Sequence, residues 1–231
     1  MIRWLFGLGQ DVFDLLYPVS CLVCGDRLTD KGHLCTYCIN YAFQPANTEG
    51  AESSKGMVLP DWIAMQDVLW EFDKGGFLQD VLHHLKYGGL AELGILLGRQ
   101  LGYKLKKNIW LHISEDTVLL PVPLHPTRQN KRGYNQSELI ARGISEITGS
   151  VAAGKSSVAR VRNTRSQTGL NAHLRKKNLH GAFQIHDMEL FRDKQVIIVD
   201  DVITTGATVF ELAGIIRESA GQIGIASVAR A

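Results

Sequence analysis

Long apolar runs are missing from this sequence, and none approaches the roughly 18 residues that a helix needs to cross a bilayer. We therefore expect a protein that is not integral to the membrane. Acidic residues are missing between positions 147 and 186, where seven Lys and Arg occur, although the net charge of the chain is only +2. Such one-sided charge predicts a local basic surface. The same stretch has a single aromatic residue, Phe183, so it offers little for stacking on bases.

The N-terminal residues 1–17 carry a helical apolar stripe but no small-residue cleavage site. This absence, together with Asp11 and Asp14, argues against a secretion signal. Because the polar face is not basic, the pattern favours an N-terminal helix packed on the protein over a helix inserted in a membrane surface. We therefore expect the protein to reside in the cytoplasm.

Cysteine is scarce, and all four residues lie within eighteen positions as two Cys-x2-Cys pairs: Cys21, Cys24, Cys35 and Cys38. This spacing can bring four thiolates into one tetrahedron, which is how proteins hold structural zinc. Two disulfides are the alternative, but a cytoplasmic chain keeps its thiols reduced, and a short segment with few apolar residues needs another source of stability. We predict a small four-cysteine zinc ribbon over residues 18–42, with a closed and therefore structural site.

The rest of the chain has room for one α/β domain of ordinary size. Residues 43–60 are mainly small and polar, which indicates a linker, and apolar segments resume from 61 to 231. Periodicity predicts strands at 66–72 and 222–228, an apolar run ended by prolines at 117–126, and helices at 77–87 and 90–105. Asn135 and Glu138 have the spacing of a capping box that opens a further helix.

Residues 195–208, QVIIVDDVITTGAT, organise the predicted domain. The run 196–199 shows no polar alternation, which is typical of a central parallel strand covered on both faces. Its carboxyl end, where open α/β sheets place ligands, carries Asp200 and Asp201. A short loop of small and hydroxyl residues follows and leads into a helix, where unpaired N–H groups favour an anion. The stretch contains no Gly-Lys-Ser or Gly-Lys-Thr, so it is not a lysine-containing phosphate loop.

A phosphate loop preceded by two carboxylates suits a phosphorylated sugar with a vicinal diol. The loop would hold the phosphate, and the carboxylates would accept hydrogen bonds from the ribose hydroxyls. The alternative is a core strand with an acidic end and a threonine-rich turn, but adjacent acids at a buried strand end are costly without a role.

Two basic segments precede this stretch. Arg128 and Arg132 follow the prolines at 121, 123 and 126 in what we expect to be a rigid loop, which an anionic leaving group would need; a solvated turn is the alternative. The segment 161–183 has no acidic residue and no clean period. A loop of this kind is typical of a lid or of an arm that contacts nucleic acid, and the alternative is an ordinary surface loop.

The segment 196–208 resembles the motif with which type I phosphoribosyltransferases bind phosphoribosyl pyrophosphate (PRPP). The resemblance implies that Asp200 and Asp201 contact the ribose hydroxyls, directly or through water bound to magnesium, and that they form the catalytic pair. The full PRPP-binding set implied is Asp200, Asp201, Val202, Thr204, Thr205, Gly206, Ala207 and Thr208. The loops that hold pyrophosphate or close over the sugar would supply Lys86, Arg128, Arg132, Arg162, Arg165 and Arg175.

The order of four motifs after a four-cysteine ribbon resembles the ComF family: LKYGG, PVPLHPTRQNKRGYNQ, RNTRSQTGL and IIVDDVITTGAT. Members are associated with natural transformation, in which bacteria take up single-stranded DNA at the inner membrane. The resemblance implies partners in the DNA-uptake machinery, a peripheral place at that membrane, and contacts of Arg175, Lys176 and Lys177 with DNA.

Two functions remain open. In the first, the protein binds PRPP and acts on single-stranded DNA through its basic face. In the second, it is an active phosphoribosyltransferase, in which a nitrogen nucleophile displaces pyrophosphate from PRPP and the basic loops and magnesium stabilise the departing group.

Overall fold

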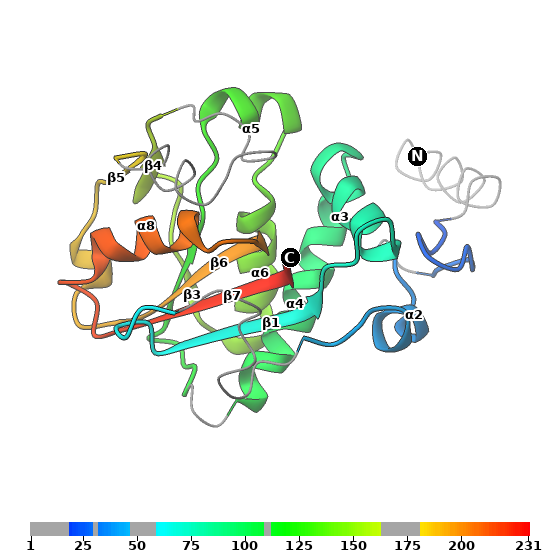
Figure 1. Ribbon diagram of the computed structural model, residues 1–231, viewed down its shortest axis with the longest axis horizontal. Coiled ribbons are helices and arrows are strands. Elements are labelled where there is room, and N and C mark those ends of the chain that lie inside the picture. Colours follow the sequence, from blue (N-terminus) through cyan, green and yellow to red (C-terminus); the bar gives the residue numbers. More distant parts are fainter. Residues whose placement is uncertain (1–18, 30–31, 47–58, 109–111, 163–180) are drawn as a thin grey trace, which may run out of the picture.

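Figure 1 shows the computed structural model of the 231-residue chain, in which residues 19–29, 32–46, 59–108, 112–162 and 181–231 are described. Its helices are α2 (Thr36–Tyr41), α3 (Phe77–Tyr87), α4 (Ala91–Lys107), α5 (Pro126–Arg132), α6 (Gln136–Thr148), the 3-10 turn η2 (Glu189–Phe191) and α8 (Ala207–Ile216). Its strands are β1 (Met65–Glu71), β2 (Val118–Pro121), β3 (Val151–Ala152), β4 (Val158–Arg160), β5 (Phe183–Ile185), β6 (Gln195–Ile203) and β7 (Gln222–Arg230). Within these ranges no helix is both long and apolar enough to span a bilayer.

Five parallel strands form the central sheet in the order β1-β7-β6-β2-β3. The long strand β6 lies in the middle, paired with β7 on one side and β2 on the other. Since all five strands run the same way, their carboxyl ends meet at one edge of the sheet. The predicted α/β architecture, a parallel sheet with flanking helices, is therefore confirmed.

Both faces of β6 are covered, as the unbroken apolar run predicts. Ile197 and Val199 belong to a core that also contains the apolar faces of α3, α4 and α6. Val196 and Ile198 belong to the opposite core, beneath the apolar face of α8. In Figure 1 the orange helix α8 accordingly crosses one side of the sheet, and the green helices α4 and α6 lie on the other.

Helices α4 and α6 approach each other through two glycines. A Cβ atom on Gly98 would lie 2.1 Å from the carbonyl oxygen of Ile140, and one on Gly143 would lie 2.2 Å from that of Ile95. Side chains at these two positions would therefore force the helices apart. The close contact fixes α6 against the sheet, and the first residues of α6 reach the carboxyl edge.

The helix expected at 77–87 is α3, and the helix expected at 90–105 is α4, with Leu90 at its N-cap position. Asn135 caps α6, because its Oδ1 accepts a hydrogen bond from the backbone N–H of Ser137 at 3.1 Å. Glu138 completes the predicted capping box differently from the usual pattern: its carboxylate contacts the side-chain amide of Asn135 at 3.4 Å.

The expectation of a basic loop at Arg128 and Arg132 is wrong, because these residues lie in the short helix α5. Pro126 occupies the first turn, where the missing N–H costs nothing and the fixed φ suits a helix. His125 caps this turn, and Gly133, with φ of +82°, ends it. The three closely spaced prolines indicated a loop, but the last of them, Pro126, is the first residue of a helix.

Strands β4 and β5 pair in an antiparallel ribbon beside the sheet. The residues that connect them, 163–180, lie outside the described part of the chain, as do the expected N-terminal helix at 1–17 and most of the expected linker. The first residues of that linker pair with the sheet: the backbone N–H of Ala46 donates to Leu69 at 3.0 Å. Phe43 also packs on Trp70, with ring centroids 4.7 Å apart. The cysteine segment is thereby joined to the edge strand β1.

Candidate functional site

The paired acids lie at the carboxyl edge of the sheet, and both are half-buried. Asp200 Oδ1 accepts hydrogen bonds from the hydroxyl of Ser137 at 3.1 Å and from the backbone N–H of Asp201 at 2.9 Å. Asp201 Oδ1 accepts from the backbone N–H of Val202 at 2.8 Å. Strand β6 and the start of α6 therefore hold both carboxylates in fixed orientations.

The residues after β6 form a small pocket. Gly206, with φ of +72°, turns the chain into α8, and no side chain of the described residues caps this helix N-terminus. The pocket has a volume of about 40 Å³. Its lining is Asp200, Val202, Ile203, Thr204, Gly206, Ala207, Thr208 and Val209. A hollow of this size holds roughly three water molecules. Its lining includes the first residues of α8, and because a helix N-terminus favours negative charge, the hollow can take a tetrahedral anion.

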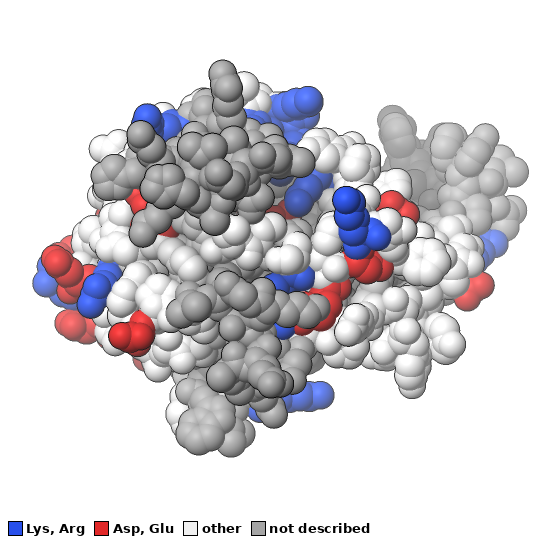
Figure 2. Space-filling view, viewed as in Figure 1, with Lys and Arg blue, Asp and Glu red and all other residues white. Residues whose placement is uncertain are grey.

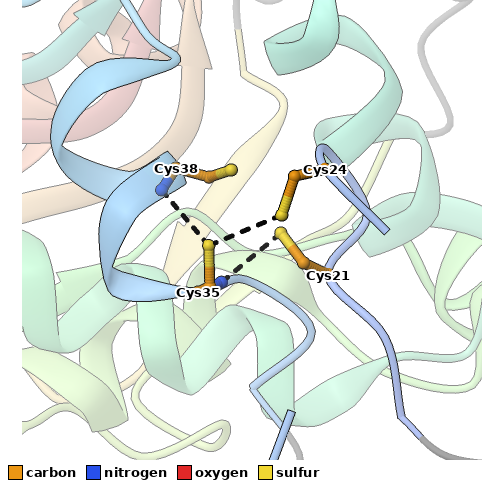
Figure 3. A group of neighbouring side chains, drawn as sticks. All are labelled: Cys21, Cys24, Cys35 and Cys38. Atoms are coloured by element: carbon orange, nitrogen blue, oxygen red, sulfur yellow. Dashed lines mark hydrogen bonds between the residues drawn. The ribbon is translucent and has the colours of Figure 1, made fainter. Parts of the chain in front are cut away.

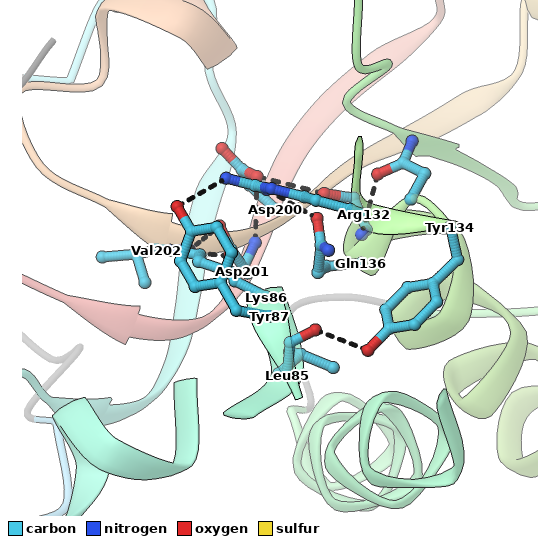
Figure 4. A network of polar contacts seen from close by, with 11 residues as sticks. Leu85, Lys86, Tyr87, Arg132, Tyr134, Gln136, Asp200, Asp201 and Val202 are labelled. Atoms are coloured by element: carbon cyan, nitrogen blue, oxygen red, sulfur yellow. Dashed lines mark hydrogen bonds and ion pairs between the residues drawn. The ribbon is translucent and has the colours of Figure 1, made fainter. Parts of the chain in front are cut away.

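Lys86 reaches the acids from another element. Its Nζ lies 2.9 Å from Asp201 Oδ2, although Lys86 belongs to the last turn of α3. The hydroxyl of Tyr134 donates to the backbone carbonyl of Leu85 at 2.8 Å and ties the turn before α6 to α3. Figure 4 shows this tie below Lys86 and the two carboxylates above it.

Arg132 lies beside the acids in the same network (Figure 4). It donates to Gln136 Oε1 at 2.8 Å and stacks on the ring of Tyr87, whose centroid is 5.2 Å from the guanidinium carbon. Gln136 is 2% exposed, yet its Nε2 has no hydrogen-bond partner within the described ranges. The same holds for the buried hydroxyl of Thr205 in the phosphate loop. Orphaned buried donors are costly, so these two atoms point to a ligand that would pair with them.

Two further guanidinium groups face this edge. Burial lowers the pKa of Arg128, and the neighbouring charge of Arg132 lowers it further. Burial, followed by the charge of Arg128, lowers the pKa of Arg160 to about 10, while Asp200 acts in the opposite direction. Arg160 is 7% exposed and lies in β4, over the ring of Phe183. Lys86, Arg128, Arg132 and Arg160 thus give four positive charges around two acids, which suits a polyanion.

The pKa of Asp200 is raised to about 7, first by burial and then by the charge of Asp201. Lys86 and the hydrogen bond from Ser137 oppose this rise. Burial lowers the pKa of Lys86, but the charge of Asp201, the hydrogen bond to it and the charge of Asp200 together raise this pKa above its ordinary value. Without a cationic ligand, the carboxyl of Asp200 therefore titrates near neutral pH.

We expect Asp200→Asn to stabilise the ligand-free protein at high pH. Because the folded-state pKa of Asp200 is raised, its contribution to stability is present below the unfolded-state pKa of about 4 and is lost as pH rises through about 7. Asparagine keeps the oxygen that accepts from Ser137 but carries no charge. Thermal melts at pH 8 should show a gain of about 2 kcal/mol. Asp116→Asn, at an exposed position, is the control and should melt as the parent protein does. If Asp200→Asn also melts as the parent protein does at every pH from 5 to 8, the assignment is contradicted.

Of the candidate residues predicted from the sequence, Lys86, Arg128 and Arg132 join the two aspartates. Arg162 is exposed beyond the end of β4, and Arg165, Arg175, Lys176 and Lys177 lie outside the described residues. Sequence reasoning assigned no role to Ser137, Gln136 or Arg160. Arg160 lies in the stretch without acidic residues, which indicated a basic surface. No local sequence feature distinguished Arg160 from the other basic residues of that stretch.

The four cysteine sulfur atoms form a second site (Figure 3). They lie within 4.8 Å of one another, and the Sγ atoms of Cys24 and Cys35 are 3.7 Å apart. A disulfide joins its sulfurs at about 2 Å, whereas tetrahedral thiolates around zinc are separated by roughly 3.8 Å. All four thiols are free, so the alternative of two disulfides is not the arrangement seen. The cluster is suited to holding one metal ion.

Backbone groups preorganise this cluster. Burial would raise the pKa of the Cys21 thiol, but backbone hydrogen bonds from Cys24, Cys35 and Val23 lower it to about 6. Burial and the neighbouring sulfurs raise the pKa of Cys38. One thiolate is therefore favoured before a metal binds, and a cation would be needed to deprotonate the others.

Residues 149–156, GSVAAGKS, match the spacing of a lysine-containing phosphate loop. The structure does not build that loop there. Gly149 ends α6, β3 follows, and Gly154 opens a turn closed by the Ser157 N–H before β4. A phosphate loop needs a helix directly after the lysine, so this match is coincidental.

Comparisons with known proteins agree with this geometry. A family model for the phosphoribosyl transferase domain matches residues 89–231. The DNA utilization protein YhgH of Salmonella typhimurium is 32% identical over 197 residues, which cover 84% of this chain and 82% of the relative. Competence protein F of Haemophilus influenzae is 38% identical over 102 residues, 44% of each chain. The chain therefore belongs to the phosphoribosyl transferase domain family, within the group of YhgH and competence protein F that its motifs resemble.

Proposed function

We propose that this protein binds PRPP together with magnesium at the carboxyl end of β6 and acts in bacterial DNA uptake. One observation carries the first part. The half-buried pair Asp200–Asp201 lies beside an uncapped helix N-terminus, and four cationic side chains surround it. PRPP has a matching group for each part of this site. Its 5′-phosphate suits the helix N-terminus, its ribose diol suits the two carboxylates, and its pyrophosphate suits the cationic side chains.

Each part of PRPP has an assigned partner. The 5′-phosphate takes the loop Thr204, Thr205, Gly206, Ala207 and Thr208, where the orphaned hydroxyl of Thr205 gains a partner. The ribose hydroxyls face Asp200 and Asp201. Magnesium prefers carboxylate oxygens, so these two residues would hold it, directly or through water, and it would neutralise the pyrophosphate.

Binding of the diol requires Lys86 to release Asp201. In the structure this lysine is the partner of Asp201 Oδ2. The pyrophosphate lies on the same side as Arg128 and Arg132, and it attracts Lys86 more strongly than a single carboxylate does. Lys86 thus passes from the acid to the ligand, and Asp201 becomes available to the ribose.

Turnover is the second candidate, and the same cations favour it. Arg128, Arg132 and Arg160 converge where pyrophosphate would leave, and stabilising that developing charge is the main task in such a transfer. A screen for PRPP-dependent pyrophosphate release over bases and nucleic acids, run beside a binding titration, separates the two candidates. Release identifies a phosphoribosyltransferase, whereas binding without release identifies a PRPP-dependent binding protein.

We propose zinc as the metal of the cysteine cluster. Four thiolates from two Cys-x2-Cys pairs, with a backbone that already favours one thiolate, are the ligands zinc prefers. Four protein ligands leave no coordination position for a substrate, so the role of the site is to hold residues 19–46 in place against β1.

The names of the relatives support a role in DNA handling, because they describe a competence protein and DNA utilization proteins. Natural transformation delivers single-stranded DNA at the inner membrane, so we place the protein in the cytoplasm, peripheral to that membrane. In Figure 2 blue side chains lie over the end of the molecule that α5 occupies in Figure 1. A basic face of this kind binds phosphates without regard to sequence.

We expect single-stranded DNA to bind in the micromolar range and to dissociate as salt is raised. Replacing Arg175, Lys176 and Lys177 by alanine should weaken binding about tenfold or more and flatten the slope of affinity against salt, because fewer counterions are released. Fluorescence anisotropy over a salt series measures both quantities. Lys106→Ala with Lys107→Ala, at the end of α4, is the control. A salt-independent affinity, or a triple variant that binds like the parent, would contradict the assignment.

A further inference from the structure

A second pocket lies beside the sugar-phosphate site, at the carboxyl end of β2. Its volume is about 160 Å³. The strand β3 is only two residues long, so the chain turns away at Gly154 and leaves a hollow between β2, α5 and β4. Of these elements, α5 and β4 lie at the same end of the molecule in Figure 1. Of the residues that line this pocket, only Arg160 belongs to the site proposed for PRPP.

The walls are apolar and partly flat. Leu120, Pro121, Pro123, Pro126 and Val158 supply them. An engineered cavity of about 150 Å³ lined by apolar side chains binds benzene, so this hollow has room for one aromatic ring. Proline rings present flat, rigid faces on which a planar ring can lie at little cost in side-chain entropy.

Polar groups stand on one side of the pocket. Lys155 Nζ lies 3.2 Å from Glu138 Oε2, which places a donor next to an acceptor. Glu138 is fixed from behind by the amide of Asn135. Gln129 adds a further donor and acceptor. Every nucleobase carries a donor beside an acceptor on its Watson–Crick edge, whereas a purely apolar ring cannot use this side.

Arg160 joins the pocket to the anion site. It lines the hollow, is 7% exposed, and is close enough to Arg128 and Asp200 to feel both charges. A ring held in the pocket would leave its attached sugar and phosphate near these guanidinium groups. The arrangement therefore fits a base that carries a phosphate, as in a nucleic acid strand.

We propose that this pocket binds one nucleobase, presented either by a single strand of DNA or by a free nucleoside. The strand as its source rests on the proposed role in DNA uptake. The base lies between the prolines and β4, with its edge on Glu138 and Lys155. The pocket distinguishes a base from an abasic site, but the paired donor and acceptor do not select one base strongly, which suits a protein that handles DNA of any sequence.

Gly154→Val tests the proposal, because Gly154 lines the pocket and a valine side chain there should occupy part of it. Among the described residues, a Cβ atom at Gly154 would meet only the Ser156 hydroxyl, at 3.8 Å, and the φ of Gly154 is not in the left-handed region. The matched control is Gly214→Val on the exposed face of α8, where a Cβ atom meets none of the residues that the structure describes within 4 Å. Melting curves and a PRPP titration on both variants report whether the fold and the sugar-phosphate site are intact.

Two probes are compared at one salt concentration: a short single-stranded oligonucleotide and its abasic counterpart with the same number of phosphates. We expect the parent protein to bind the strand with bases about tenfold more tightly. Gly154→Val should reduce that affinity to the abasic level, leave binding of the abasic strand unchanged, and leave PRPP binding unchanged. Glu138→Gln should remove part of the preference, whereas Glu146→Gln, on the same helix but paired with Arg99, should remove none.

A titration with cytidine and adenosine distinguishes the two sources. Binding of nucleosides that Gly154→Val abolishes, without any preference between the two strands, assigns the pocket to free nucleosides. The proposal is overturned if the parent protein shows neither a base preference nor nucleoside binding, or if Gly154→Val keeps whichever of these the parent shows. If the parent protein does not bind PRPP, the result contradicts the proposed function instead.

Discussion

We expect Asp200→Asn combined with Asp201→Asn to abolish magnesium-dependent binding of PRPP. The two carboxylates are the acceptors proposed for the ribose diol, and β6 and Ser137 hold them in place. A hydrogen bond to a charged group contributes about 1.5–3 kcal/mol, so losing both should weaken binding at least about a hundredfold. Isothermal titration of PRPP in the presence of magnesium measures this directly.

The control for this experiment is Asp116→Asn combined with Asp193→Asn, which removes the same charge from two exposed positions. Titration at pH 6 and pH 8 adds a second readout. Because the pKa of Asp200 is raised to about 7, the parent protein should bind PRPP more weakly at pH 6, where this carboxyl is largely protonated. Heats that are the same in the double variant and the parent would refute the assignment of the diol site.

The second large effect concerns the metal. We expect Cys38→Ser to remove zinc and to destabilise the protein by several kcal/mol, because the free energy of binding structural zinc, on the order of 10 kcal/mol, is coupled to folding. Cys38 is 2% exposed and belongs to the core that also contains Phe43 and Trp70. Loss of the metal should therefore loosen the contact of residues 19–46 with β1. Metal content per chain and thermal melting are the measurements.

His33→Asn is the matched control, because this residue lies between the two cysteine pairs, has a φ of +63° that asparagine tolerates, and is not a predicted ligand. It should keep one zinc per chain and the melting temperature of the parent. A chelator should lower the melting temperature of the parent to that of Cys38→Ser. If the parent melts at the same temperature with and without its metal, the cluster does not stabilise the fold.

The part of the site that is continuous in sequence was predictable. The apolar run of β6, its acidic end, the loop with Gly206 and the apolar stripe of α8 follow one another within a single strand-loop-helix unit, and each has a local signature. The cysteine cluster was predictable for the same reason, since ligand spacing within eighteen residues restricts the geometry. Local patterns suffice where neighbouring residues build the site.

The remaining site residues depend on contacts between distant segments. Ser137 lies 63 positions from Asp200, and its hydroxyl has no sequence feature that predicts this bond. Arg160 is buried beside Arg128 only because β4 folds back next to α5. Lys86, which the LKYGG motif contains, was expected to contact pyrophosphate, whereas the structure pairs it with Asp201. Tertiary packing determines these contacts, and local propensity does not encode them.

The most direct test of the central claim is a crystal structure of the protein with PRPP and magnesium. We predict the 5′-phosphate within hydrogen-bond distance of the backbone of residues 204–208, both ribose hydroxyls on the Asp200 and Asp201 side, and Lys86 moved from Asp201 to the pyrophosphate. Density for PRPP away from the carboxyl end of β6, or a complex in which Lys86 still pairs with Asp201 while the ribose touches neither acid, would contradict it.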